Sequence, residues 1–220
     1  MGRSLTLDVA EWAAVLSGKT GEEFGAAIAT DDIPAQRRRR LPPFTRNVLR
    51  CALPLLRTAP ASPVVFAAEH GDLESTVALL GDLARGEVLS PALFALSVHN
   101  APAGALSLCV SPAGDHTAIA GGPYSFAAGL TEAFLRLNDG AADSVILVLA
   151  EERLPAVYAA FDSDAPGAFL AMRLRLTEDA DKSAIDTAPG RAGVVAAVRA
   201  LAGGGRRVRF TPPMAEARAA

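Results

Sequence analysis

The side chains that could act as nucleophiles are few and poorly placed. Cys109 lies in the apolar stretch ALSLCV, and Cys51 lies in NVLRCALPLL, which has helical spacing. A thiol in apolar surroundings is normally structural, because burial disfavours the reactive thiolate. The sequence has no Gly-x-Ser-x-Gly elbow, no Gly-x-Gly-x-x-Gly motif and no Gly-x-x-x-x-Gly-Lys-Ser/Thr loop. These features favour a chain without ordinary nucleophilic or nucleotide chemistry, with a reactive Cys109 as the less favoured alternative.

The three histidines do not form a recognisable ligand pair. His70, His99 and His116 fall in three separate expected elements, and their spacing matches no pair on one helix face. We therefore expect no metal site and no bound cofactor. His99 stands with Ser97 and Asn100 at a junction between elements, where polar side chains often satisfy free backbone groups. A capping or buried hydrogen-bonding role is favoured there over catalysis.

The run Arg37, Arg38, Arg39 and Arg40 is the strongest local concentration of charge. Guanidinium groups bind phosphates well, on nucleic acid or on the phosphopantetheine arm of an acyl carrier protein. A solvated loop or intramolecular pairing is the favoured interpretation. With 21 basic against 24 acidic residues, the net charge of −3 gives no reason to expect a nucleic-acid partner.

The composition predicts one large folded domain. The chain has 220 residues, of which 50% are hydrophobic and 20% charged, and this is ample for a core. We expect a single domain over residues 1–211 and a frayed tail over 212–220, which begins with two prolines. Two cysteines are too few for a disulfide scaffold, and neither an export signal nor a membrane span is evident. A cytoplasmic location is expected.

The order of apolar patterns predicts an α/β sheet covered by helices. Strands are expected at 62–68, 116–121, 144–149, 169–176 and 208–210, and helices at 72–86, 125–137 and 194–201. The first helix has Asp72 as a candidate N-cap and an apolar face of Leu73, Val77, Leu80 and Ala84. The strand at 169–176 carries alternating arginines and is expected near a sheet edge. Alternating strands and helices are typical of a covered sheet.

Two consecutive segments carry a family resemblance. SPALFALSVHNAPAGALSLCV and DHTAIAGGPYSFAAGLTEAF resemble the N-terminal half of β-ketoacyl synthases of the thiolase fold. Asn100 and Gly104 match that family's Asn-x-x-x-Gly helix, and Gly129 matches a later helix glycine. In this register the family's nucleophilic cysteine falls at Gly121. The resemblance implies a thiolase-like half, with a mixed and mostly parallel sheet covered by helices on both faces.

Further motifs narrow the resemblance. RRRRLPPFTRNVLRCAL, the HGD at residues 70–72 and ESTVALL look like stand-alone ketosynthase-like proteins of aryl polyene and related pigment pathways, described as chain-length-factor-like. The resemblance covers roughly residues 37–158. In complete ketosynthases a second half supplies two histidines, whereas every histidine here precedes residue 117. The resemblance therefore implies a non-catalytic subunit that pairs with a complete ketosynthase and that an acyl carrier protein approaches.

The resemblance also implies where a partner would bind. In the family, the strand before the nucleophile pairs across the dimer axis, and here that strand would comprise His116, Thr117, Ala118, Ile119 and Ala120. Side chains ahead of the Asn-x-x-x-Gly helix reach the partner's acyl tunnel, and the matching positions are Leu93 and Phe94, with Leu96 and Val98 close behind. These four residues could set acyl chain length or could simply be core residues.

Two other functions stay open. The chain could be a thiolase-fold binding or scaffold protein that homodimerises. Less favoured is a divergent acyltransferase using Cys109 or a nearby hydroxyl group.

Overall fold

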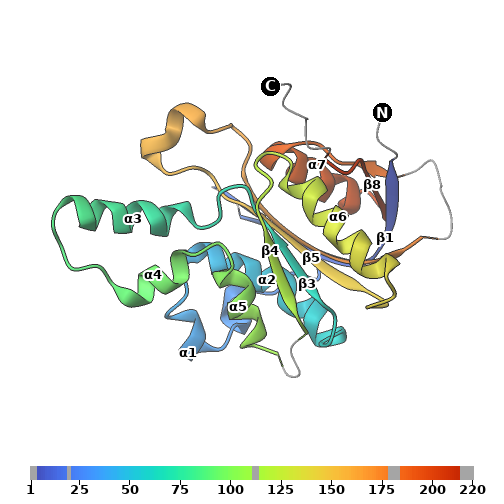
Figure 1. Ribbon diagram of the computed structural model, residues 1–220, viewed down its shortest axis with the longest axis horizontal. Coiled ribbons are helices and arrows are strands. Elements are labelled where there is room, and N and C mark those ends of the chain that lie inside the picture. Colours follow the sequence, from blue (N-terminus) through green and yellow to red (C-terminus); the bar gives the residue numbers. More distant parts are fainter. Residues whose placement is uncertain (1–3, 19–20, 111–113, 178–183, 214–220) are drawn as a thin grey trace.

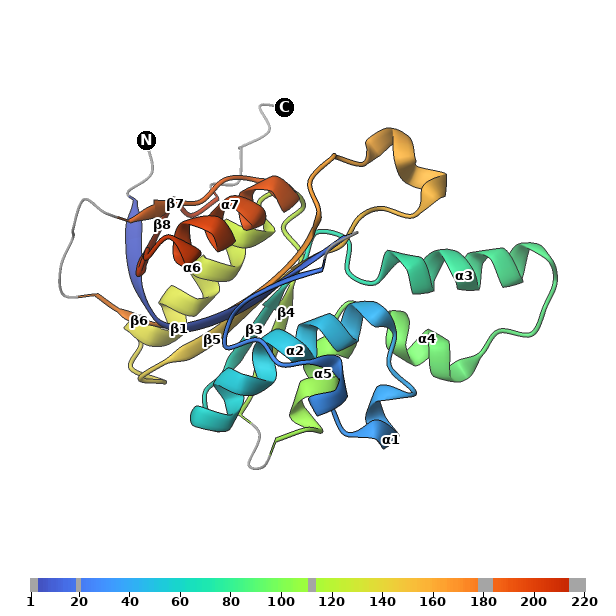
Figure 2. The same ribbon diagram turned by 180° about the vertical axis from the view of Figure 1, so that it is seen from behind.

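The computed structural model describes residues 4–18, 21–110, 114–177 and 184–213. Their strands form one sheet of order β4-β3-β5-β6-β1-β8-β7, with β2 paired to β1 (Figures 1 and 2). The strands are β1 (Leu5–Ser17), β2 (Glu22–Gly25), β3 (Val64–Ala67), β4 (His116–Ile119), β5 (Val145–Glu151), β6 (Gly167–Leu176), β7 (Ile185–Asp186) and β8 (Arg207–Phe210). The α-helices are α1 (Ala35–Arg38), α2 (Pro43–Thr58), α3 (Leu73–Ala84), α4 (Pro91–Ser97), α5 (Ala101–Ser107), α6 (Ser125–Asn138) and α7 (Gly190–Ala202). Two 3-10 helices are η1 (Thr30–Asp32) and η2 (Ala156–Phe161).

The sheet is mixed, and the α/β class is confirmed. Strand β3 pairs in parallel with β4 and β5, and β7 pairs in parallel with β8. The pairs β1–β2, β1–β6, β1–β8 and β5–β6 are antiparallel. The expected parallel majority is therefore wrong for the described residues. Each parallel pair needs a long crossover connection between its strands, whereas an antiparallel pair does not. Antiparallel pairs form the rest of this sheet.

The strand expected near an edge lies in the middle of the sheet. Strand β6 pairs with β5 on one side and with β1 on the other. Its arginines are accommodated near its end, where Arg173 forms an ion pair of 3.0 Å with Glu11 on β1 and Arg175 is exposed. Strand β1 was not among the expected strands, because its alternation is interrupted by a register shift between Val9 and Glu11. The alternation of arginines with apolar residues indicates a half-exposed strand, but it contains no information about the neighbouring strand β1.

Helices cover both faces of the sheet, as expected. Alternate residues of the strands point to opposite faces, so the sheet contributes to two cores. Helices α6 and α7 pack over one face, and α2 and α5 pack over the other (Figures 1 and 2). Gly129 allows α6 to approach closely, because a Cβ there would lie 2.7 Å from Leu147 Cδ1 on β5. No helix among the described residues is both long and apolar enough to cross a bilayer.

Helices α3 and α4 form an arm that extends away from the sheet (Figure 1). Asp72 caps α3 as expected, accepting a 3.1 Å hydrogen bond from the Ser75 amide. The apolar face of α3 is largely uncovered in its second half, where Leu80 is 53% and Leu83 is 61% exposed. Helix α4 has no buried residue at all. The arm thus presents apolar side chains to solvent in the isolated chain.

The remaining expected elements agree with the structure within a few residues, including β3, β4, β5, α6, α7 and β8. Pro212 and Pro213, at the start of the expected tail, have no regular secondary structure. Residues 214–220 of that tail lie outside the described residues.

Candidate functional site

Three parallel strands end at one edge of the sheet and bring polar groups together there. Glu69 and His70 follow β3, Glu151 ends β5, and Gly121 follows β4. In open α/β sheets, functional groups commonly gather beyond the carboxyl ends of parallel strands, because loops from several strands meet there. This edge is the candidate functional site.

The position matched to the family's nucleophile holds no reactive group. Gly121 donates its amide hydrogen to Ser125 Oγ at 3.0 Å, and the Ser125 hydroxyl donates to the Gly122 carbonyl at 2.7 Å. Ser125 is also buried, with 2% of its surface exposed. The nearest hydroxyl on α6 therefore stabilises the turn before the helix. Gly121 itself has no atom that could form a thioester.

Neither cysteine is placed at this edge as an activated thiol. Cys109 is half-buried against the core under α2 and α5, away from α6. Burial raises the pKa of its thiol, and the nearby Arg37 charge opposes this only in part. Burial raises the pKa of Cys51 to about 12, and its thiol donates to the Phe169 carbonyl at 3.4 Å. A thiolate is disfavoured at both positions.

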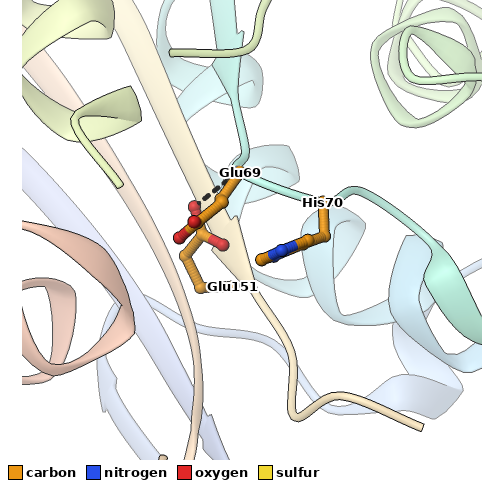
Figure 3. Close-up of side chains that lie close together, drawn as sticks. All are labelled: Glu69, His70 and Glu151. Atoms are coloured by element: carbon orange, nitrogen blue, oxygen red, sulfur yellow. Dashed lines mark hydrogen bonds between the residues drawn. The ribbon is translucent and has the colours of Figure 1, made fainter. Parts of the chain in front are cut away.

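Glu69, His70 and Glu151 form a compact cluster of titratable groups (Figure 3). One candidate ligand atom from each lies within 4.8 Å of the others. Glu151 is 6% exposed and accepts a 2.8 Å hydrogen bond from the Glu69 amide. Burial raises the pKa of the Glu151 carboxyl to about 8, and the Glu69 charge adds to this effect. The site therefore favours neutralisation of Glu151 near neutral pH.

Replacing Glu151 with glutamine is expected to stabilise the metal-free protein at pH 7 to 8. An unfolded glutamate has a pKa near ~4.3, so folding with a carboxyl pKa of about 8 costs increasing free energy as pH rises between these values. Glu151→Gln removes this cost, on the order of 3 kcal/mol at pH 7. Urea denaturation in EDTA at pH 5 and pH 7.5 measures it: the gain should be small at pH 5 and larger at pH 7.5. A gain independent of pH, or a loss, would contradict this assignment.

The polar junction residues lie between the arm and the sheet. His99 Nε2 is 3.1 Å from the Ala68 carbonyl oxygen at the end of β3, and the His99 ring contacts Phe66 edge-on at 5.5 Å. Ser97 donates to the Phe94 carbonyl at 2.9 Å. Asn100 stands at the N-cap of α5 without a side-chain cap hydrogen bond. His99 thus attaches the arm beside the candidate site.

The arginine run borders a separate cavity of about 360 Å³. Its lining comprises Gln36, Arg37, Arg40, Leu41, Ala105 and Leu108. Arg38 forms an ion pair with Asp31, with a distance of 2.5 Å between Arg38 Nη1 and Asp31 Oδ1. Arg37, Arg39 and Arg40 are exposed, and the structure gives them no ion pair among the described residues. Two of these exposed cations therefore border a partly apolar cavity.

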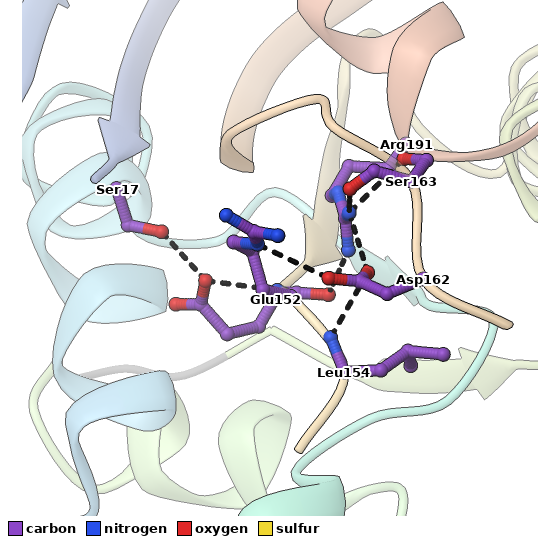
Figure 4. A network of polar contacts seen from close by, with 7 residues as sticks. Ser17, Glu152, Leu154, Asp162, Ser163 and Arg191 are labelled. Atoms are coloured by element: carbon purple, nitrogen blue, oxygen red, sulfur yellow. Dashed lines mark hydrogen bonds and ion pairs between the residues drawn. The ribbon is translucent and has the colours of Figure 1, made fainter. Parts of the chain in front are cut away.

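A buried ionic network anchors the loop between β5 and β6 (Figure 4). Arg191, at the start of α7, donates to Asp162 Oδ1 and to the Ser163 carbonyl, both at 2.6 Å, and to the Glu152 carbonyl at 2.8 Å. Ser17 donates to Glu152 Oε1 at 2.6 Å. Burial would raise the pKa of Asp162, but hydrogen bonds from Arg191, Leu154 and Arg153 hold it well below its usual range.

The anchored loop carries an exposed apolar segment. Within η2, Val157 is 67% and Phe161 is 82% exposed. The loop projects from the same end of the molecule as the α3–α4 arm (Figure 1). It is a second apolar surface that a partner could cover.

The tertiary structure separates some expected site residues and groups others. His116 lies at the opposite end of β4 from Gly121, so it does not join His70 and His99 near the carboxyl end of β3. Leu93, Phe94, Leu96 and Val98 lie in or just after α4, and none is buried. The sequence does not predict the cluster of His70 with Glu69 and Glu151, because its members come from the ends of two separate strands and not from one helix. The position of acidic residues directly after two apolar strands was the available signal.

The sheet order and the helical layers define a thiolase-like ketosynthase half. A similar structure is the ketosynthase (ApeO) in complex with its chain length factor (ApeC) from Xenorhabdus doucetiae, at 28% identity and a TM-score of 0.67 over 79% of this chain and 80% of that one. The ishigamide ketosynthase/chain length factor matches at 15% identity and a TM-score of 0.58, over 82% of this chain and 64% of that one.

A third structure is a complex of a type II polyketide synthase acyl carrier protein with its ketosynthase, AntDE:AntF. It matches at 14% identity and a TM-score of 0.54, over 80% of this chain and 64% of that one. No curated protein sequence shows significant similarity to the chain. The family model for the β-ketoacyl synthase N-terminal domain matches residues 10–202. The chain therefore belongs to the β-ketoacyl synthase N-terminal domain family, which confirms the resemblance found in the sequence.

Proposed function

We propose that the chain is a non-catalytic, chain-length-factor-like subunit that pairs with a complete ketosynthase and shapes its acyl pocket in polyene or fatty-acid-like biosynthesis. The observation that supports the proposal is the turn at Gly121, which the sequence resemblance matches to the family's nucleophile position: glycine has no reactive side chain, and the Ser125 hydroxyl is hydrogen-bonded within the turn. The likeness to a ketosynthase and chain length factor complex supports this class of subunit. An aryl polyene product is the chemistry that the sequence motifs favour.

The exposed apolar arm supports pairing. A monomer rarely leaves Phe94, Leu80 and Leu83 exposed along one projection unless a partner covers them. Helix α4 lacks any buried residue, so Leu93, Phe94, Leu96 and Val98 are not core residues of the isolated chain. Contact with the partner's acyl pocket is the role that we propose for them. Each methylene excluded from that pocket would forgo about 0.8 kcal/mol of burial.

Co-expression with the ketosynthase encoded nearest to it tests the proposal. The chain carries an affinity tag, and the mass of the eluted complex is determined by native mass spectrometry. A one-to-one complex is expected. Recovery of the chain alone as a stable homodimer would instead favour a scaffold or binding protein. Labelling of Cys109 by an acyl-thioester probe, lost in Cys109→Ala, would favour an acyltransferase.

We further propose that the cavity beside the arginine run receives an acyl carrier protein through its phosphopantetheine phosphate. Exposed guanidinium groups of Arg37 and Arg40 would bind the phosphate, and Leu41 and Leu108 would contact the apolar part of the arm. The solvated-loop interpretation remains the alternative for Arg39, which does not line this cavity.

Reversing two charges is expected to weaken carrier binding. Arg37→Glu with Arg40→Glu should lower the affinity of the subunit complex for the loaded carrier protein by about tenfold or more, with a reduced salt dependence. Arg199→Glu with Arg206→Glu makes the same charge change at exposed positions on and after α7 and is the matched control. Surface plasmon resonance at two salt concentrations measures both. Equal losses in the two double variants would show a net-charge effect and contradict a local site.

A further inference from the structure

We propose that Glu69, His70 and Glu151 form a binding site for one divalent transition-metal ion, with zinc as the best fit. Glu151 is the last residue of β5 and is held in register with β6, whereas Glu69 and His70 lie in the bend just after the neighbouring parallel strand β3. This inference concerns the chain alone and does not depend on its pairing with a ketosynthase.

The geometry suits an ion coordinated by three protein ligands. The ligand atoms lie within 4.8 Å of one another, whereas ligands around tetrahedral zinc are about 3.3 Å apart. A small rotation of the exposed His70 side chain toward the glutamates, which it already faces, would close the difference (Figure 3). Two carboxylates and one imidazole are a donor set that zinc accepts, leaving a fourth position for water.

Glu151 provides a second, independent indication. It is a nearly buried carboxylate with 6% of its surface exposed, and among the described residues it accepts one hydrogen bond, from the Glu69 amide. Its carboxylate lies in the cluster beside Glu69 and His70 (Figure 3). A buried carboxylate normally acquires a cation or further donors, because desolvation is costly.

The neighbouring cation does not satisfy this requirement. Arg191 contributes a favourable charge to Glu151, but its terminal nitrogens are bonded to Glu152, Asp162 and Ser163. Among the described residues no lysine or arginine forms an ion pair with Glu69 or Glu151. A divalent ion would neutralise both carboxylates at once.

The site can be reached from solvent. His70 is exposed and also lines a cavity of about 300 Å³, together with Asp72, Glu74 and Arg153. An entry path from solvent is one requirement of a metal site.

Zinc titration of the untagged, EDTA-treated full chain tests the proposal by isothermal calorimetry and thermal unfolding. One equivalent should bind saturably and raise the melting temperature. His70→Ala and Glu151→Gln should each weaken binding about tenfold or more and abolish the thermal shift. Circular dichroism and the urea midpoint of each variant without metal show whether a loss of zinc binding reflects unfolding.

His116→Ala is the matched control, since it removes an exposed histidine at the far end of β4. It should leave zinc binding unchanged. Magnesium, which prefers six oxygen ligands, should bind far more weakly than zinc. Unsaturable binding, unchanged binding in the two cluster variants, or an equal loss in His116→Ala would overturn the proposal.

Discussion

Replacing Ala118 with proline is expected to abolish the proposed complex with a ketosynthase while the isolated chain stays folded. Among the described residues, β4 is an edge strand that is hydrogen-bonded only to β3. The Val64 amide donates to the Asp115 carbonyl and the Ala68 amide to the Ile119 carbonyl. Because bonding groups alternate along a strand, residues 115, 117 and 119 face β3, whereas the amide of Ala118 faces outward.

The outward amide is the group that a partner strand would use. Proline removes that donor and leaves a partner carbonyl unpaired, which costs about 1–3 kcal/mol, or roughly 5- to 150-fold in affinity. The expected result is loss of the one-to-one complex in affinity capture, with unchanged circular dichroism and urea midpoint for the chain alone. His116→Pro changes a second outward amide and should act in the same way.

Thr117→Pro is the informative control. The Thr117 amide faces β3, and its hydroxyl accepts a 2.5 Å hydrogen bond from Arg136, so this variant should destabilise the isolated chain itself. If Ala118→Pro and His116→Pro remain folded and still retain the complex, pairing through β4 is wrong. The arm and η2 would then be the surfaces to test next.

Among the substitutions proposed for this chain, Arg191→Met is expected to cause the largest fall in the free energy of unfolding. The side chain is 8% exposed, and its removal leaves the Asp162 carboxylate, 9% exposed, without its closest cation. Breaking a buried ion pair by removing one partner typically costs about 3–5 kcal/mol. That is a large part of the ~5–15 kcal/mol by which a domain is usually stable.

Urea denaturation at pH 7 measures this loss, and Arg153→Met is the matched control. Arg153 pairs with the same carboxylate at 3.1 Å, but its side chain is 55% exposed, so the expected cost is below ~1 kcal/mol. Both variants remove one cation from beside Asp162, but the two arginines differ in burial. The difference between the two losses of unfolding free energy therefore measures the effect of burial. Similar costs for both would show that Arg191 acts as an ordinary surface ion pair.

The Arg191 network also holds the loop that carries η2 in place. It fixes both ends of the loop that carries Val157 and Phe161, so Arg191→Met should release η2 as well as destabilise the fold. Limited proteolysis separates these two effects. Cleavage within η2 of a variant that is still folded by circular dichroism would show local release of the loop.

Local sequence patterns determined several elements. The apolar run of β5, the capped start of α3 and the periodic face of α6 depend on neighbouring residues, so they could be predicted. The match of Gly121 to the family's nucleophile also depends on local spacing along one strand and helix, and it stays a prediction. These features need no knowledge of distant contacts.

Only the tertiary structure decided which elements meet. The central position of β6 depends on β1, more than 150 residues away, and this pairing makes Arg173 an internal ion-pair partner. The cluster at His70 joins residues about eighty positions apart, and the buried state of Glu151 follows from strands on both sides. Likewise, the apolar pattern of α4 is the same for a core helix and a partner-facing helix. Burial is set by what packs against a side chain, and a linear pattern does not contain that information.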